Sequence, residues 1–177
     1  MNLENMVKAI LYTYPKFKMI DRDYKDHIEN QAVLSYRYKG ATADLAEYIA
    51  SEILRRKRLL VLKNALDGFL KSLNDEEATL LQLRYFGKIR MMKESAKPKG
   101  ESEWQKVCSS EQKRERIASW HWSERSYYRK QNRLLKKIVE AFNRMGFTKD
   151  VLEKEYMQYE FLKAVYRFLL RTSGKKE

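Results

Sequence analysis

Apolar residues recur every three or four positions along almost the whole chain, with polar residues between them. This is the spacing of amphipathic helices, which complete a turn every 3.6 residues. The sequence contains no sustained alternation of apolar and polar positions and no Asn-Gly or Asp-Gly turn joining two such runs, so strands are not expected. Only six Gly and two Pro interrupt the pattern. We therefore predict an all-α fold.

Residues 1–73 are predicted to form a helical arm. Its helices cover about 3–14, where Pro15 stops the first one, about 16–36 and about 43–73. Gly40 is a candidate C-cap and Thr42 a candidate N-cap between the last two. Because that connection is short, an antiparallel helical hairpin is the expected arrangement.

The third of these helices carries a seam of coiled-coil type. Its residues are spaced three and four apart, as are the core positions of a heptad repeat: Leu59, Leu62, Leu66, Phe69 and Leu73. Three heptads or fewer are available. This length suffices either for packing within the chain or for a dimer seam, and the spacing alone leaves both open.

Residues 74–146 are predicted to form a second unit. Asn74 is placed to cap a helix with the acidic first turn Asp75-Glu76-Glu77, a position that the helix dipole favours, and Gly87 should end it. The polar stretch at about 93–112 contains Pro98 and Gly100 and is predicted to be an inserted loop. A short helix at about 110–119 should follow.

The last helix of this unit begins after Ser123, a good N-cap, with Trp122 placed to pack back on the next turn as a hydrophobic staple. Gly146 should end it. Its inward face is predicted to carry Tyr127, Gln131, Leu134, Ile138, Phe142 and Met145.

Residues 147–177 are predicted to form a C-terminal helix, capped by Thr148 and ending near Arg171. Apolar or aromatic residues lie on more than one of its faces, so it either packs between two other helices or pairs with a second protein. We expect the core role. Its expected apolar side comprises Val151, Tyr159, Leu162, Val165, Tyr166 and Leu169.

The net charge of +13 is concentrated in one part of the 177-residue chain. Between Lys88 and Lys137 the sequence holds 15 Lys or Arg and 6 Glu, a net +9 in 50 residues, while the other 127 residues carry +4. A local excess of this kind is typical of a protein that binds nucleic acid, although an acidic membrane or protein would also be attracted to it.

The cysteine and histidine content and the motifs of the sequence argue against several classes of protein. A single cysteine, Cys108, rules out an internal disulfide, and with the lack of a signal-peptide profile and of a long apolar run it suggests a soluble cytoplasmic protein without membrane contact. Cys108, His121 and His27 are too few for a zinc site. No nucleophile, triad or phosphate-loop motif is present, so we expect neither enzyme activity nor a cofactor.

Two stretches taken together resemble a known motif: Leu73-Asn74-Asp75-Glu76-Glu77 through Leu83-Arg84-Tyr85-Phe86-Gly87, and Trp122-Ser123-Glu124-Arg125-Ser126-Tyr127-Tyr128-Arg129. They resemble the helix-turn-helix of the fourth region of the sigma-70 family. The resemblance is strongest to the small sigma-like regulators of Gram-positive phages and mobile elements, of the autolysin-regulator and late-transcription-regulator type, and covers about 73–142. It implies a transcription regulator whose second motif helix lies in the major groove of promoter or operator DNA.

The chain departs from that family pattern in two places. Counting back from Ser123, the turn carries Trp120, His121 and Ile117 where the family has Leu, Gly and Ala, so the turn is bulkier. About 20 residues also separate the helix that ends with Leu83-Arg84-Tyr85-Phe86-Gly87 from the next one, where the family has only a few.

We expect the first two turns of the Ser123 helix to contact DNA, because these turns reach deepest into the groove. Arg125 and Arg129 are the candidates for guanine, whose O6 and N7 a guanidinium can bond together. Tyr128 is a candidate for a thymine methyl or a sugar. The full expected set is Ser123, Arg125, Ser126, Tyr128, Arg129, Lys130, Arg133 and Lys137, the last two and Lys130 being assigned to phosphates. The alternative is an ordinary solvated helix face.

The expected function is therefore a sequence-specific, DNA-binding transcriptional regulator that binds double-stranded DNA, with RNA polymerase and a second copy of the chain as further candidate partners. One alternative is a helical adaptor that binds RNA polymerase or a phage protein through the seam at 59–73. Another is a small phage packaging subunit, which carries a similar motif and would form a ring.

Overall fold

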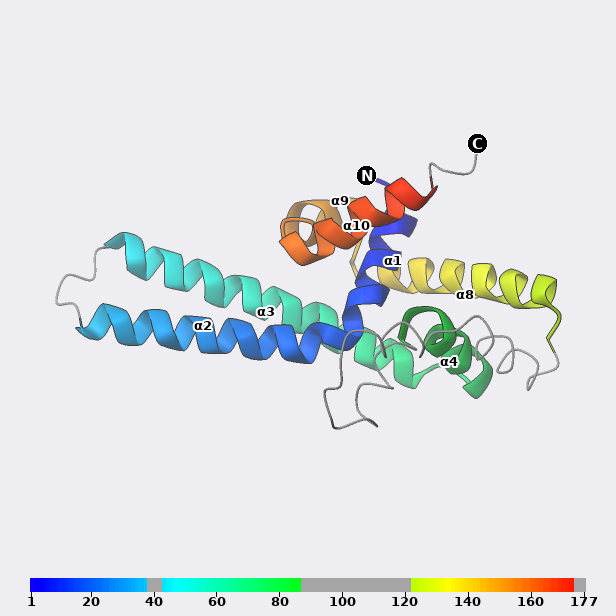
Figure 1. Cartoon of the computed structure of the whole chain (residues 1–177), viewed down its shortest axis with the longest axis horizontal. Coiled ribbons are helices and arrows are strands. Elements are labelled where there is room, and N and C mark those ends of the chain that lie inside the picture. The colour runs from blue at the N-terminus through cyan, green and yellow to red at the C-terminus, as the bar shows by residue number, and fades with distance from the viewer. Residues whose placement is uncertain (38–42, 87–121, 174–177) are drawn as a thin grey trace, which may run out of the picture. The chain divides into compact units, whose positions relative to one another are not determined.

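The computed structural model describes residues 1–37, 43–86 and 122–173. Every element in these ranges is helical and none is a strand, which confirms the all-α prediction (Figure 1). The chain divides into two compact units, a hairpin unit (Thr13–Lys71) and an α8 unit that combines Met1–Tyr12 with the chain from Ser72 onward.

The hairpin unit begins with a turn of 3₁₀-helix, η1 (Tyr14–Lys16), that contains Pro15. Two long helices follow, α2 (Phe17–Arg37) and α3 (Ala43–Lys71), which lie side by side and run in opposite directions (Figure 1). The helix before Pro15 ends at Thr13, as expected from the restricted backbone of the residue that precedes a proline.

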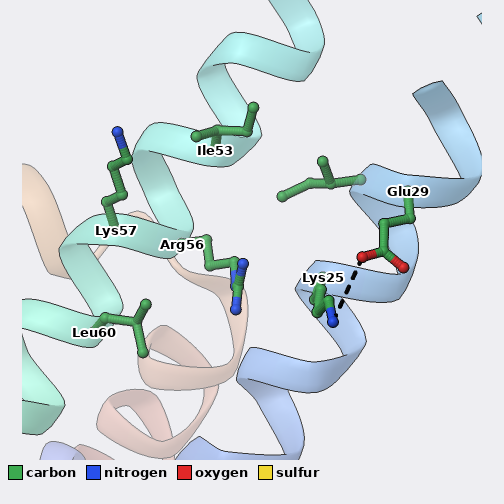
Figure 2. A pocket seen from close by; sticks show the side chains of 7 residues that line it. Lys25, Glu29, Ile53, Arg56, Lys57 and Leu60 are labelled. Carbon is green, nitrogen blue, oxygen red and sulfur yellow. Dashed lines mark ion pairs between the residues drawn. The ribbon is translucent and has the colours of Figure 1, made fainter.

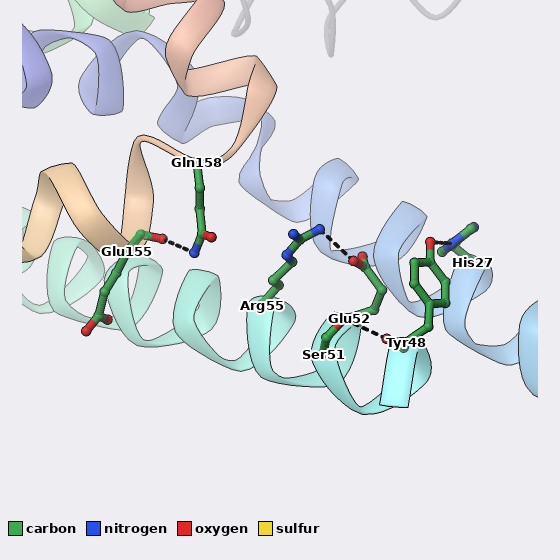
Figure 3. A network of polar contacts seen from close by, with 7 residues as sticks. All are labelled: His27, Tyr48, Ser51, Glu52, Arg55, Glu155 and Gln158. Atoms are coloured by element: carbon green, nitrogen blue, oxygen red, sulfur yellow. Dashed lines mark hydrogen bonds and ion pairs between the residues drawn. The ribbon is translucent and has the colours of Figure 1, made fainter. Parts of the chain in front are cut away.

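Polar contacts tie α2 to α3 along their length. The Arg56 side chain donates to Asp21 at 2.7 Å. Nearer the distal end, the Nε2 atom of His27 lies 3.0 Å from the Tyr48 hydroxyl (Figure 3). At the base, Asp67 of α3 accepts a hydrogen bond from the Tyr14 hydroxyl of η1 and another from Lys63 of its own helix. The Arg56–Asp21 and His27–Tyr48 contacts join α2 to α3 and fix their register.

The leucines of the α3 seam pack against residues of the same chain. Leu59, Leu62 and Leu66 are fully buried, with exposed fractions of 1% or less, whereas Phe69 and Leu73 are half-buried. Leu73 lies beyond the end of α3. Of the two roles left open for the seam, the structure shows packing within the chain for these three leucines.

The α8 unit contains α1 (Leu3–Thr13) up to Tyr12, and the helices that follow Ser72. These are α4 (Asp75–Leu81), the π-helical turn η2 (Gln82–Phe86), α8 (Glu124–Arg144), α9 (Lys149–Val151), the π-helical turn η3 (Leu152–Tyr156) and α10 (Glu160–Ser173). The fully buried apolar residues include Met6, Ile10, Leu80, Leu81, Tyr127, Ile138, Phe142, Leu152 and Leu162.

The predicted caps at the start of α4 and α9 are present. Asn74 accepts a hydrogen bond from the Glu77 amide at 2.8 Å, and the Glu77 side chain accepts in return from the Asn74 amide, which completes a capping box. Thr148 accepts from the Val151 amide. Gly146 has a φ of 87°, the left-handed conformation that a glycine adopts at low cost after a helix.

The expectation of one continuous C-terminal helix is wrong. The chain breaks after Tyr156, and the Gln158 side chain donates to the Glu155 carbonyl at 2.7 Å within the break (Figure 3). Tyr156 is the last residue of η3, and Met157 is the first residue after it. The break buries both, at 3% and 5% exposure.

Met145 is also not part of the inner face of α8 as expected, because it is 40% exposed. Helix α8 ends at Arg144 and Met145 is its C-cap, with ψ near 4°, so the helical spacing no longer applies. Several predictions lie outside the described residues: the caps Gly40, Thr42 and Gly87, the loop at 93–112, the helix at 110–119, and the roles of Cys108, Trp120 and His121.

Candidate nucleic-acid interface

The start of α8 is fixed by two local interactions. The Ser123 hydroxyl accepts a hydrogen bond from the Ser126 amide at 3.2 Å, which confirms Ser123 as the N-cap. The Trp122 and Tyr127 rings lie 6.4 Å apart between centroids, so the expected hydrophobic staple is also present. These contacts define where the helix begins and how the chain enters it.

The inner face of α8 is buried against the rest of the α8 unit. Gln131, which is 5% exposed, donates from Nε2 to the Leu80 carbonyl at 2.7 Å and to the Tyr127 hydroxyl at 3.1 Å. Burial raises the pKa of Tyr127, which keeps this phenol protonated. The bonds join α8 to α4 and fix the rotation of α8 about its axis. The face comprises Tyr127, Gln131, Leu134, Leu135, Ile138 and Phe142.

The outer face of α8 is cationic through its first three turns. Arg125, Arg129 and Arg133 are exposed and follow one another at intervals of four residues, which places their side chains on the same side of the helix. Within the described part of the chain, none of the three forms an ion pair. Glu140, in a later turn, is exposed on the same side and limits the cationic stretch.

Two of the expected phosphate ligands have partners inside the protein. Lys130 pairs with Glu76, and its Nζ atom lies 5.1 Å from the centre of the Trp122 ring. Lys137 donates to Glu77 at 2.7 Å. Both lysines therefore lie on the side of α8 that faces the acidic first turn of α4. The three outer arginines lie on a different side of the helix.

The remaining expected residues are placed at the edge of the outer face. Tyr128 is 44% exposed and its ring meets that of Tyr127 edge-on, with centroids 5.3 Å apart. As expected for neighbours on a helix, Tyr127 is buried and Tyr128 is not. Ser123 is exposed and Ser126 is half-buried, with its amide used in the cap.

The structure places two further residues on the outer face: Lys136, which the sequence already puts on the cationic side of this helix although the expected set omits it, and Asn132, which was not expected there. Asn132 and Lys136 are exposed, and they follow Arg125 and Arg129 at intervals of seven residues, two turns further along the helix. Their helical spacing was the available signal. Among the described residues the outer face therefore comprises Arg125, Arg129, Asn132, Arg133 and Lys136.

The hairpin unit holds a separate candidate site, a hollow of about 300 Å³ between α2 and α3 (Figure 2). Its apolar part is formed by Ile28, Ile53 and Leu60. Most of its charged groups are already paired, since Lys25 lies 3.6 Å from Glu29 and Arg56 binds Asp21. The hollow is suited to an apolar side chain rather than to an anion. Lys25, Glu29, Arg56 and Lys57 complete its lining.

No cluster of three or more potential metal ligands occurs in residues 1–37, 43–86 and 122–173. No helix in these ranges combines the length and the apolar character that crossing a membrane requires. Comparisons of the chain with protein-family models, with curated proteins and with solved structures found no match.

Proposed function

We propose that the chain is a sequence-specific DNA-binding regulator of transcription, of phage or mobile-element type, which reads the major groove with α8. The observation that carries the proposal is the row of exposed arginines on the first three turns, Arg125, Arg129 and Arg133. A guanidinium can bond O6 and N7 of guanine at once, and the remaining cations can meet phosphates.

The attachment of α8 to α4 supports this proposal. The buried Gln131 bond to Leu80, with the ion pairs of Lys130 and Lys137, holds the inner face while the outer face stays free to enter a groove. A helix that is fixed before binding loses little conformational entropy on docking. Which bases the arginines contact then depends on how α8 is oriented in the groove.

Selection of bound duplexes from a random pool tests this function. We expect wild-type protein to enrich a short motif that contains at least one guanine. The same selection with Arg129→Ala should lose preference at one base pair, and its affinity for the wild-type motif should fall by about 5-fold to about 160-fold, since a bidentate contact contributes about 1–3 kcal/mol.

Arg144→Ala is the matched control, because Arg144 is exposed in the last turn of α8 and beyond the cationic stretch. It should enrich the same motif as wild type. A pool that stays random after selection with wild-type protein would contradict the proposal, as would equal effects of Arg129→Ala and Arg144→Ala.

The second candidate function is a helical adaptor for RNA polymerase or a phage protein. The apolar hollow at Ile28, Ile53 and Leu60 favours it, whereas three leucines of the α3 seam, Leu59, Leu62 and Leu66, are buried within the chain. For an adaptor, Ile53→Asp would abolish partner binding and the arginine variants would not. For the DNA regulator, Ile53→Asp leaves the selected motif unchanged.

A further inference from the structure

The side of α3 that points away from α2 carries an apolar stripe. Leu54 and Val61, one heptad apart, are 54% and 58% exposed, although both are large aliphatic residues in the middle of a 29-residue helix. Small residues continue the stripe in both directions at heptad-like intervals. Its members are Ala43, Ala50, Leu54, Val61, Ala65 and Gly68.

Nothing among the described residues requires a glycine at position 68. A Cβ atom at this position would meet nothing within 4 Å, and its φ is not positive, so alanine would fit. Glycine within a helix costs about 1 kcal/mol relative to alanine. A small residue on this stripe does, however, allow another helix to approach closely.

The stripe is self-complementary when read in opposite directions. In an antiparallel pair of α3 helices related by a two-fold axis between Lys57 and Arg58, residues at equal distances from that axis face each other. Leu54 then faces Val61 of the other copy, and Ala50 faces Ala65. Between positions 50 and 65, large residues therefore meet large ones and small residues meet small ones, while Gly68 faces Glu47 of the other copy.

We infer that this stripe of α3 binds a second copy of the chain, with the two α3 helices antiparallel and in this register. The inference does not depend on DNA binding. Lys57 is exposed beside the stripe, at the edge of the hollow in Figure 2, and the two-fold axis brings it next to Lys57 of the other copy. Salt screens this repulsion, so the dimer is stronger at high salt, whereas DNA binding weakens with salt.

Disulfide cross-linking tests the register, in a Cys108→Ser background that removes the single native cysteine. Leu54→Cys and Val61→Cys chains are mixed at micromolar concentration and oxidised with glutathione disulfide at moderate and high salt. We expect a cross-linked dimer in the mixture, more of it at high salt, and none from either variant alone. Ala50→Cys mixed with Ala65→Cys should behave in the same way.

A mixture of Val33→Cys and Val61→Cys is the matched control, because Val33 is equally exposed but lies on α2. It should give no dimer above background. Sedimentation equilibrium of Cys108→Ser protein should show a dimer that Leu54→Asp converts to a monomer, with an unchanged circular dichroism spectrum because Leu54 is exposed in the single chain.

Three results would overturn the inference. A monomeric mass in sedimentation equilibrium at all salt concentrations would mean that the chain does not form this dimer. Cross-linking of Leu54→Cys with itself means that the helices are parallel. Equal yields from the control mixture and the Leu54–Val61 mixture mean that the contact is not specific to the stripe.

Discussion

The Nζ atom of Lys137 lies 2.7 Å from Oε1 of Glu77, so the C-terminal part of α8 is held to the first turn of α4 by an ion pair. Its sequence neighbour Lys136 is exposed on the outer face instead. Neighbouring residues on a helix point about 100° apart. Two adjacent lysines of the same charge therefore have different roles, one in holding α4 and one in facing a ligand.

This difference predicts different salt dependences for two otherwise equal substitutions. Lys136→Gln should lower the slope of log affinity against log salt for duplex DNA by about 1, because one phosphate contact is lost. Lys137→Gln should change that slope much less, since its charge is already compensated by Glu77. Fluorescence anisotropy titrations at several salt concentrations measure both slopes. Equal decreases for the two variants would show that the Lys137–Glu77 pair opens on DNA.

The Gln131 bond to α4 predicts a stability effect. Gln131→Leu removes the donor to the Leu80 carbonyl and to the Tyr127 hydroxyl in a buried site, and should lower the free energy of unfolding by about 1–3 kcal/mol. Urea unfolding monitored by circular dichroism checks this. Asn132→Ala, on the exposed face next to it, should change stability by no more than about 0.5 kcal/mol. Similar losses of stability in both variants would mean that the hydrogen bonds of the buried Gln131 amide do not stabilise the fold measurably.

The local features of α4 and α8 were predictable from the sequence. The caps at Asn74 and Ser123 and the Trp122–Tyr127 staple depend on residues within a few positions of one another. The burial of Tyr127 beside an exposed Tyr128 follows from helical spacing alone. Such features need no knowledge of what packs against the helix.

Other features depend on contacts distant in sequence and could not be predicted. The pairing of Lys130 with Glu76 joins residues 54 positions apart, and the periodicity of α8 alone cannot distinguish an outward lysine from one that faces another helix. No glycine or proline marks the break after Tyr156, so the uninterrupted helical pattern of the sequence conceals it. The α3 stripe at Leu54 and Val61 is hard to recognise in the sequence because it lies in the same helix as the stronger leucine seam.

Tyr85 predicts a specific alkaline sensitivity. Burial raises the pKa of its phenol to about 12, with Arg84 lowering it in part, from about 10 in the unfolded chain. The raised pKa means that the folded state favours the protonated phenol. Its contribution to stability is fully present below about pH 10 and is lost as the pH rises through about 12.

The measurement is the free energy of unfolding in urea at several pH values from about 8 to about 11.5. Wild-type protein should lose more stability over the upper part of this range than Tyr85→Phe, which has no proton to lose there. Tyr128→Phe controls for the loss of a phenol from the surface and should follow the wild-type curve. Parallel curves for wild type and Tyr85→Phe would refute the assignment.

The central claim is that the outer arginines of α8 form the DNA-binding surface, and a charge-matched comparison tests it most directly. One variant replaces Arg125, Arg129 and Arg133 with Gln, and the other replaces Lys149, Lys154 and Arg167, which are exposed elsewhere in the α8 unit. Both have a net charge three lower than the wild-type +13. The measured quantity is the affinity for the selected duplex at two salt concentrations.

If the outer face of α8 binds DNA, the arginine variant should lose at least about 100-fold in affinity and its salt slope should fall by about 2 to 3, while the control variant stays within about 5-fold of wild type. Equal losses in the two variants would mean that overall charge alone attracts DNA. That result would contradict the assignment of α8 as the reading helix.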